Sequence, residues 1–362
     1  MQKLLFILFV FLSLFSCSDP KPLSQDQLTP GDQGTIGWTP IFQDPPERNI
    51  CSETKRNEIL NSENDFEVLN CNLTLERNEN ISIKLVFIGN GSSGVTLDCN
   101  DNDTSNIEIH SVVSNGELVP PHDITIQNCN VFGHIRLWGP GVNGGSERLL
   151  DSSRTEDHVT RTRDSAPYHI TFDNVAIYPP DGTALYFAPG VHHCVVRNSV
   201  IITDSYNVQI YLDAETYGIE LIDNYIESQS LILGRELIAV DGSSYNIIRG
   251  NTIANAPGGG IYFYRNCGFN RIIRHATPSN NIVENNEIDC DCEIRGIFTE
   301  CAGIYLGSRN GGKDYCSDDA GYEFGSSISD QDHARFNEVR GNILSGCRIE
   351  VGNETNHSNV IE

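Results

Sequence analysis

The chain has 362 residues and a formal net charge of −25. Such an excess of acidic groups disfavours nucleic acids and anionic membrane surfaces as nonspecific partners. A polyanionic substrate would need a local basic site that works against this overall charge.

The N-terminal residues 1–16 have the form of a signal peptide, because one Lys is followed by an apolar run too short to span a membrane. The run ends in Leu14-Phe15-Ser16-Cys17, which resembles the lipobox of bacterial lipoproteins, although Phe15 departs from the usual pattern. The resemblance implies acylation of Cys17 and a lipid anchor in the bacterial cell envelope, at the outer membrane or the periplasmic side. The alternative is an ordinary secretory signal with an incidental Cys.

Residues 17–46 are rich in Pro, Gln, Asp, Gly and Thr, a composition that cannot bury a core and predicts a flexible tether. Residues 47–362 then form one body. Near its start, residues 52–64 form either a small helix or a loop that caps the open end of this body.

Within this body, a short motif returns: an apolar residue, two variable residues, Asn, one variable residue and another apolar residue. It occurs at VVRNSV (195–200), LIDNYI (221–226), IRGNTI (248–253), VENNEI (283–288) and VRGNIL (339–344). Asn198, Asn224 and Asn251 are spaced by 26 and then 27 residues. A fixed period of this size is typical of repeat proteins whose units stack on their neighbours.

A second series of short segments lies between the Asn motifs. It comprises IRLW (135–138), LYFA (185–188), IYLD (210–213), IAVD (238–241), IYFY (261–264) and IYLG (304–307). The residues are β-branched or aromatic, as in strands, and the breaks are rich in Gly, Asn, Asp and Ser. The two series predict a solenoid of parallel strands around one apolar core, with inserted loops where the spacing is long.

The recurring Asn residues have a structural interpretation. Asn tolerates left-handed backbone geometry, and its amide can bond neighbouring backbone groups at a tight turn. We therefore expect ladders of stacked amides at the turns rather than a catalytic role for these residues.

The 12 Cys residues predict disulfides, since an exported protein meets an oxidising compartment. Cys51 and Cys71 are a plausible pair. Four cysteines crowd one inserted region and lack the spacing of a zinc site, so disulfide-stapled loops are favoured over metal: Cys290, Cys292, Cys301 and Cys316. Cys129, Cys194 and Cys347 fall at repeat positions and are expected to be small core residues.

Strand side chains alternate between the two faces of a sheet, so the apolar positions of the second series point inward and the intervening ones outward. The outward positions are unusually aromatic, and exposed aromatic side chains mark binding surfaces and can stack on sugar rings. This pattern predicts a sugar-binding surface, unless inserted loops cover it. Its residues are Arg136, Trp138, Tyr186, Tyr211, Tyr262 and Tyr305.

Asp213 and Asp241 fall at the same register on neighbouring coils, where parallel strands are about 4.8 Å apart. Two carboxylates this close repel one another, which can prepare an acid beside a base. The pair could also hold Ca²⁺ together with Glu215. Alternatively, both Asp residues bond turn amides.

Downstream of this pair, the chain offers Tyr264, Arg265, Arg274 and His275. A lyase or epimerase acting on a uronate must neutralise the carboxylate and move a proton beside it. Arg265 and Arg274 suit the first task, and Tyr264 or His275 the second. Arg309 is a weaker candidate at one end of the groove.

The Asn motifs and aliphatic segments resemble right-handed parallel β-helix proteins of the pectate-lyase-like superfamily, and GVTLDCN (94–100) is similar to their first-coil strand. The segments YLDAE (211–215), AVDGS (239–243) and GGGIYFYRNCG (258–268) are similar to a group of exported bacterial β-helix proteins without a firmly assigned activity. The resemblance implies an all-β, single-stranded right-handed parallel β-helix. No characterised enzyme's motif is present, so no catalytic residue is carried over.

These observations favour a lipid-anchored envelope protein that binds a uronate-containing polysaccharide and modifies it by lyase or epimerase chemistry. Two alternatives remain open. The first is a glycoside hydrolase using Asp213 and Asp241, and the second is a non-catalytic glycan-binding or structural envelope protein. No cofactor is required by any of the three, and Ca²⁺ is compatible with the lyase or epimerase.

Overall fold

The computed structural model describes residues 38–40, 42–141, 145–230, 234–266, 271–292, 301–307, 333–354 and 358–362. Residues 32–362 form one compact unit. The expected signal peptide, Cys17, most of the tether, Arg309 and Cys316 lie outside the described residues. Within the described residues, no helix is both long and apolar enough to cross a membrane.

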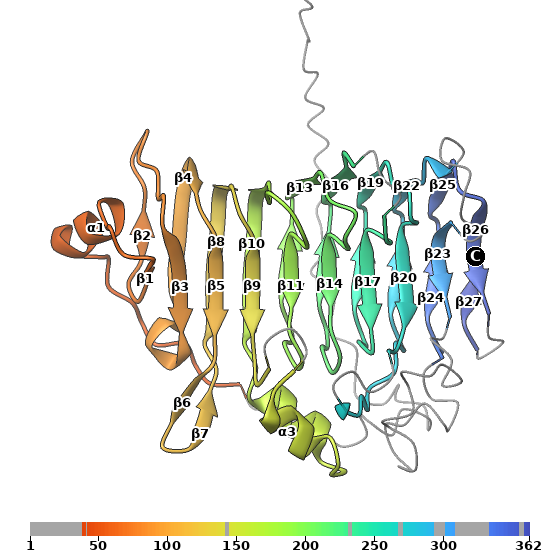
Figure 1. Cartoon of the computed structure of the whole chain (residues 1–362), viewed down its shortest axis with the longest axis horizontal. Helices are drawn as coiled ribbons and strands as arrows, with labels where there is room; N and C mark the ends of the chain where they lie inside the picture. Colours follow the sequence, from red (N-terminus) through yellow and green to blue (C-terminus); the bar gives the residue numbers. More distant parts are fainter. Residues whose placement is uncertain are drawn as a thin grey trace, which may run out of the picture. The chain divides into compact units, whose positions relative to one another are not determined.

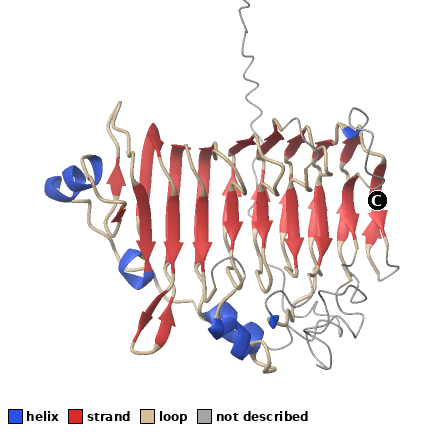
Figure 2. Ribbon diagram, in the orientation of Figure 1, coloured by secondary structure: helices blue, strands red, loops and turns tan. Residues whose placement is uncertain are grey.

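Short parallel strands stack coil upon coil along this unit, as Figures 1 and 2 show. One sheet has ten strands, which pair in chain order. They are β1 (Phe66–Val68), β3 (Lys84–Ile88), β5 (Ile107–His110), β9 (Ile135–Trp138), β11 (Leu185–Phe187), β14 (Ile210–Leu212), β17 (Ile238–Asp241), β20 (Ile261–Tyr264), β23 (Ala302–Leu306) and β26 (Ile349–Asn353).

A second sheet of 15 strands closes the coils. Its long early strands are β4 (Thr96–Thr104), β8 (His122–Val131) and β10 (Tyr168–Ile177), preceded by β2 (Leu73–Thr74). Beyond β10 each coil contributes two shorter strands, because β10 pairs with both β12 and β13. One series is β12 (Val195–Arg197), β15 (Glu220–Ile222), β18 (Ile247–Arg249), β21 (Ile282–Glu284), β24 (Glu338–Arg340) and β27 (Val360–Ile361). The other series is β13 (Val200–Thr203), β16 (Tyr225–Ser228), β19 (Thr252–Ala254), β22 (Glu287–Asp289) and β25 (Ile343–Ser345).

The core is one continuous cluster of aliphatic and Phe side chains running through every coil. Pairing of Ile210 with Ile238 and of Ile261 with Ile304 puts identical residue types above one another. The second pairing joins residues 43 positions apart and confirms that a loop is inserted there rather than a coil lost. The fold is a right-handed parallel β-helix, as predicted.

The predicted amide ladders are present, and the described part of the chain contains two. In one, Asn224 Nδ2 donates to Asn251 Oδ1 and Asn251 Nδ2 to Asn286 Oδ1, each at 2.9 Å, and Asn286 continues to Asn342. The second ladder, in which each amide bonds the next, contains Asn246, Asn281, Asn337 and Asn359. Each amide also satisfies buried backbone groups that the turns leave without strand partners.

Asn198 does not belong to the ladder in which the sequence motif placed it. Val196, not Val195, pairs with Leu221, so Ser199 occupies the ladder position and its amide donates to Asn224 Oδ1 at 3.0 Å. Asn198 is exposed and has a positive φ of 52°. It shares that left-handed position with Asp223 and Gly250, where a short polar side chain or Gly is tolerated.

The N-terminal end of the β-helix carries α1 (Glu53–Leu60), which settles the open choice between helix and loop. The Ser52 hydroxyl caps it by accepting the Lys55 amide, and Ile59 is buried in the core cluster. Two further short helices, α2 (Glu147–Ser152) and α3 (His158–Asp164), lie in the segment expected to be a loop. A 3₁₀ turn at Gly89–Ser92 and a hairpin of β6 (Val112–Ser114) with β7 (Glu117–Val119) complete the described elements.

Four disulfides staple the coils of the described residues. They are Cys51–Cys71, Cys99–Cys129, Cys290–Cys347 and Cys292–Cys301. The Cys51–Cys71 prediction is confirmed. Cys129 and Cys347 are disulfide-bonded rather than free core residues, because stacked coils bring each beside a Cys of a neighbouring coil. Cys194 is free and buried, as expected.

The Asn251→Ala variant tests the ladder. It removes the acceptor of the buried Asn224 amide and the donor to Leu221 O, so we expect a loss of about 2–4 kcal/mol of unfolding free energy in urea titrations. The matched control is Thr252→Ala, whose side chain points away from the core and should cost little. Equal stability of the two variants would contradict a structural role for the ladder.

Candidate functional site

The outward positions of the ten-stranded sheet form a continuous row, which we call the outer row. Strand pairing sets Arg136, Tyr186, Tyr211, Ala239, Tyr262 and Tyr305 side by side. The register predicted from the sequence is therefore confirmed. The ring centroids of Tyr262 and Tyr305 are 5.0 Å apart, and those of Tyr186 and Tyr211 are 5.8 Å apart.

The exposure of this row differs from the prediction at two positions. Tyr186 and its neighbour Trp138 are only 8% and 9% exposed, and they pack with Ala188 and Tyr211 in an apolar cluster. Tyr211, Tyr262, Tyr305 and Arg136 remain half-exposed. The accessible part of the predicted sugar-binding surface is therefore its half-exposed tyrosines. Burial also lowers the pKa of Arg136 to about 10, and its guanidinium donates to the Ala184 carbonyl.

Asp213 and Asp241 lie directly after β14 and at the end of β17, at equivalent positions of neighbouring coils. One atom, Arg274 Nη1, contacts both: it is 3.2 Å from Asp213 Oδ1 and 2.6 Å from Asp241 Oδ2. All three side chains are buried. We call these three residues the carboxylate–arginine cluster.

Two tyrosines of the outer row bind this cluster from the side of the sheet. The Tyr186 hydroxyl donates to Asp213 Oδ2, and the Tyr211 hydroxyl donates to Asp241 Oδ2 at 2.5 Å. The backbone and side-chain amides of Asn266 also donate to Asp241. The Ala214 amide donates to Asp213. Asp213 therefore bonds a turn amide, which is one of the alternatives that the sequence left open.

These contacts set the protonation states. Burial raises the pKa of Asp213 even though the Arg274 guanidinium opposes the rise, and the charge of Asp241 adds to it. Burial alone would lower the pKa of Arg274, but the two carboxylates raise it well above its usual value. Burial, with the adjacent carboxylates, also raises the pKa values of Tyr186 and Tyr211, so both hydroxyls keep their protons at neutral pH.

A second buried group fixes the segment that carries Arg274. Glu215 accepts the amides of His275 and Ala276, at 2.7 and 2.9 Å, and Arg265 donates to the Arg274 carbonyl at 2.9 Å. Burial works against a charged Glu215, but the imidazoles of His158 and His275 and the His275 amide favour it, and its pKa is lowered. The His275 ring donates Nε2–H to the Ser153 carbonyl, which ties this segment to the end of α2.

Three side chains that were predicted to act on the substrate have binding partners inside the protein. Arg274 is engaged by two carboxylates, and Arg265 is fully buried behind it. The Tyr264 hydroxyl donates to Glu236 and accepts from Arg235, both at 2.6 Å, and is 1% exposed. These side chains support the sheet face from within rather than line its surface.

The sequence analysis missed Arg235, Glu236 and His158. Arg235 is the accessible one, with 42% of its side chain exposed and its guanidinium 5.9 Å from the Tyr211 ring centroid. Nothing in the repeat pattern marks it, because it lies in the turn before β17. His158 and Arg163 belong to α3, which the strand pattern does not predict.

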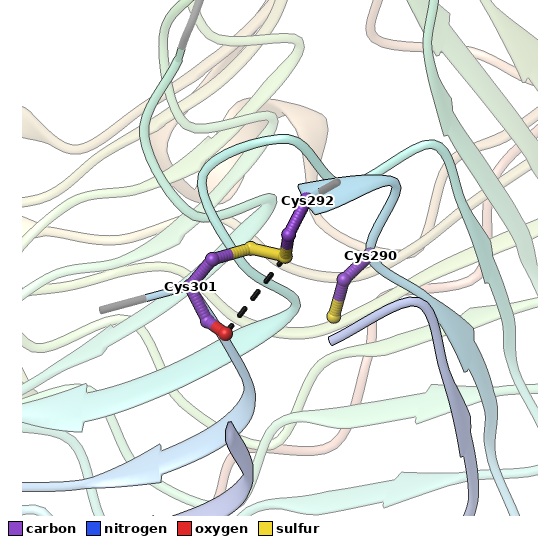
Figure 3. Close-up of side chains that lie close together, drawn as sticks. All are labelled: Cys290, Cys292 and Cys301. Carbon is purple, nitrogen blue, oxygen red and sulfur yellow. Dashed lines mark hydrogen bonds between the residues drawn. A yellow bond between two sulfur atoms is a disulfide. The ribbon is translucent and has the colours of Figure 1, made fainter. Parts of the chain in front are cut away.

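A metal site was predicted at Asp213, Glu215 and Asp241. Among the described residues these three carboxylates do not meet within 4.8 Å, whereas Cys290, Cys292 and Cys301 do. The three sulfurs belong to two disulfides, so they offer no thiolate ligands (Figure 3). Between Asp213 and Asp241, the guanidinium of Arg274 supplies the positive charge that a cation would bring.

No family model and no curated protein matches the chain. Among solved structures, the surface adhesin PfbA of Streptococcus pneumoniae is similar at 12% identity and a TM-score of 0.41, over 77% of this chain and 63% of that one. The tailspike protein of E. coli bacteriophage HK620, in complex with a pentasaccharide, is similar at 15% identity and a TM-score of 0.42, over 75% and 43%. The periplasmic alginate epimerase AlgG is similar at 10% identity and a TM-score of 0.29, over 84% and 79%. The chain spans less than two thirds of the first two proteins.

The Arg274→Gln variant tests the electrostatics of the cluster. It leaves two buried carboxylates without their cation, so we expect a loss of about 3–5 kcal/mol of unfolding free energy at pH 7. A carboxyl whose pKa is higher in the folded than in the unfolded state stabilises the fold at low pH, and this contribution is lost as pH rises through the folded pKa. The deficit of the variant should therefore shrink as pH falls towards about 4.

Arg249→Gln is the matched control, because Arg249 is half-exposed and pairs with Glu284 at 3.5 Å on the second sheet. It should cost no more than about 1 kcal/mol. A deficit of Arg274→Gln that does not change with pH would contradict the assigned charges.

Proposed function

We propose that this chain is a bacterial envelope protein, anchored through an acylated Cys17, that binds an acidic polysaccharide across the half-exposed tyrosines of the outer row. The observation that carries the proposal is their placement: Tyr211, Tyr262 and Tyr305 lie in one register on neighbouring coils, with Arg235 at their edge. Tyrosine rings stack on sugar faces, and their hydroxyls bond sugar hydroxyls.

Arg235 is the group we assign to the carboxylate of a bound uronate. The protein as a whole is strongly acidic, so an anionic chain needs a local cation. Arg265 and Arg274 are buried and bind internal partners. Arg235 also binds Glu236 and Tyr264 through Nη2, but 42% of its side chain is open to solvent beside Tyr211. A guanidinium also binds a carboxylate in two-point geometry, which Lys cannot do.

Modification of the glycan, of lyase or epimerase type, is a second step of the proposal. Tyr211 links the accessible row to Asp241, since its hydroxyl donates to that carboxylate. In proton abstraction, the Tyr211 oxygen takes the proton next to the uronate carboxylate while its own proton passes to Asp241. The raised pKa of Tyr211 requires such a coupled transfer, because a free tyrosinate is not populated at neutral pH.

The hydrolase and the Ca²⁺ centre, which the sequence left open, fit the same residues less well. A hydrolase that employs Asp241 as nucleophile would need its carboxylate oxygens open to substrate, but Arg274, Tyr211 and Asn266 all bind them. A Ca²⁺ centre at the Asp pair would have to displace Arg274. Chelator should therefore leave both binding and turnover unchanged.

Binding is tested by titrating the purified protein with polygalacturonate and alginate. Tyr262→Ala and Arg235→Gln should each weaken binding by about tenfold or more, since aromatic and charge contacts at a binding surface are worth 1–2 kcal/mol. Tyr225→Ala is the control, because Tyr225 is an exposed tyrosine on the other sheet. A similar loss in all three variants, or in none, would overturn the assignment of this face.

Catalysis is tested separately with Tyr211→Phe and Asp241→Asn. The Phe variant keeps the ring and loses the hydroxyl, so binding should persist while unsaturated or epimerised product, followed by ultraviolet absorbance and NMR, is almost abolished. Asp241→Asn cannot accept the Tyr211 proton and should likewise lose nearly all turnover. Full turnover in Tyr211→Phe would contradict the relay. Absence of product from the wild type on every glycan would reduce the function to binding.

A further inference from the structure

A column of imidazole and tyrosine rings follows successive coils of the β-helix and shares no residue with the outer row. Strand pairing and bridges align His122, Tyr168, His192 and Tyr217 on successive coils. Tyr168 is stacked between His122 and His192, with ring centroids 4.8 and 5.1 Å away and planes within 5° of parallel. The sequence analysis assigned no role to these residues.

The chain segment before the β-helix lies against this column. The Trp38 ring contacts His192 and Tyr217, and its Nε1–H donates to Asp164 at 3.1 Å. Phe42 packs on His169 at 4.2 Å between ring centroids. Both residues fall in the segment expected to be a flexible tether, so its last part is bound to the body instead.

A pocket of about 260 Å³ lies where this segment meets the column. Its apolar wall is the end of the β6–β7 hairpin at Leu118, Val119 and Pro120. Its polar lining comes from Gln43, His122, Arg163, Asp164, Tyr168 and His192. The volume is below the roughly 300–1,000 Å³ of sites for drug-sized ligands, and so suits one sugar ring rather than a chain.

His122 carries an unsatisfied polar atom at this pocket. The side chain is 2% exposed, and its Nδ1 lies 2.7 Å from Asp123 Oδ2. An ionised carboxylate only accepts, so Nδ1 donates, and in the neutral ring Nε2 keeps a lone pair. Among the residues that the structure describes, Nε2 has no hydrogen-bond partner, and a buried polar atom of this kind is costly unless something bonds it. A ligand hydroxyl would do so.

Arg163 brings positive charge to the same pocket. Its guanidinium carbon lies 4.9 Å from the Trp38 ring centroid and 4.5 Å from that of Tyr217, and Nε donates to the Glu215 carbonyl. Held between two rings, this buried cation attracts a ligand carboxylate, and the Asp164 carboxyl that also lines the pocket is engaged by Trp38 Nε1–H. The ligand chemistry called for is thus a carboxylate and a hydroxyl on a compact ring.

We infer that this pocket is a second ligand site, which binds a single acidic sugar unit of the hexuronate class. The inference does not rest on the proposed function of the outer row, because the two sites share no lining residue. Since Trp38 and Gln43 help to line the pocket, a bound sugar would also hold the N-terminal segment against the β-helix.

The test is calorimetric titration of the full-length protein in detergent with galacturonate, and with galactose as the neutral counterpart. We expect galacturonate to bind at least about tenfold more tightly than galactose. His122→Phe keeps a ring stacked on Tyr168 but removes Nε2, and should weaken galacturonate binding about tenfold. Val119→Trp fills the pocket while every polar lining residue is kept, and it should abolish binding. With two pocket variants, the inference can still be tested if one of them fails to fold.

Tyr262→Ala separates this site from the outer row. It should leave galacturonate binding at the pocket unchanged while weakening polysaccharide binding. Three results would overturn the inference: no galacturonate binding by the wild type, unchanged affinity in both pocket variants, or loss of binding in Tyr262→Ala alone.

Discussion

The parallel register between neighbouring coils is the constraint on which every site in this protein depends. Backbone pairing alone would allow a coil to slip, but a slip of one residue would turn the apolar side chains outward. The Asn ladders oppose such a slip, because each amide bonds the Asn one coil further on as well as a backbone carbonyl. The ladders that fix the register of the core side chains therefore also align the outward side chains in rows.

Such rows bring residues that are far apart in the sequence together on one continuous surface. Tyr211, Ala239, Tyr262 and Tyr305 are neighbours only because their strands pair in register. The carboxylate–arginine cluster adds depth to that surface: Asp213 and Asp241 follow from the register, and Arg274 reaches them from an insertion. Glu215 and Arg265 then hold the insertion by its backbone, so charge placement and loop conformation depend on each other.

Much of this could be predicted from the sequence because it is periodic. The parallel pairing, the outer row and the equivalence of Asp213 and Asp241 all follow from positions of apolar residues. The Asn198 error arose from the same source, since a Ser stands at the ladder position and an Asn one residue earlier. The repeat period does not predict the insertions. These are α3 with Arg163, the helix α2 whose end binds His275, and the loop that brings Arg274 to the Asp pair. Groups of the insertions hold Arg265 and satisfy the buried charges of the Asp pair through contacts of high sequence separation that no local pattern specifies.

The central claim is that an acidic polysaccharide lies across the half-exposed tyrosines of the outer row. Hydroxyl-radical footprinting of the protein with and without polygalacturonate or alginate, with oxidation measured for each tyrosine by mass spectrometry, tests it most directly. The account predicts that the glycan protects Tyr211, Tyr262 and Tyr305 from oxidation while Tyr225, on the other sheet, reacts as before. Unchanged oxidation of all four tyrosines, or protection of Tyr225 without the others, would contradict it.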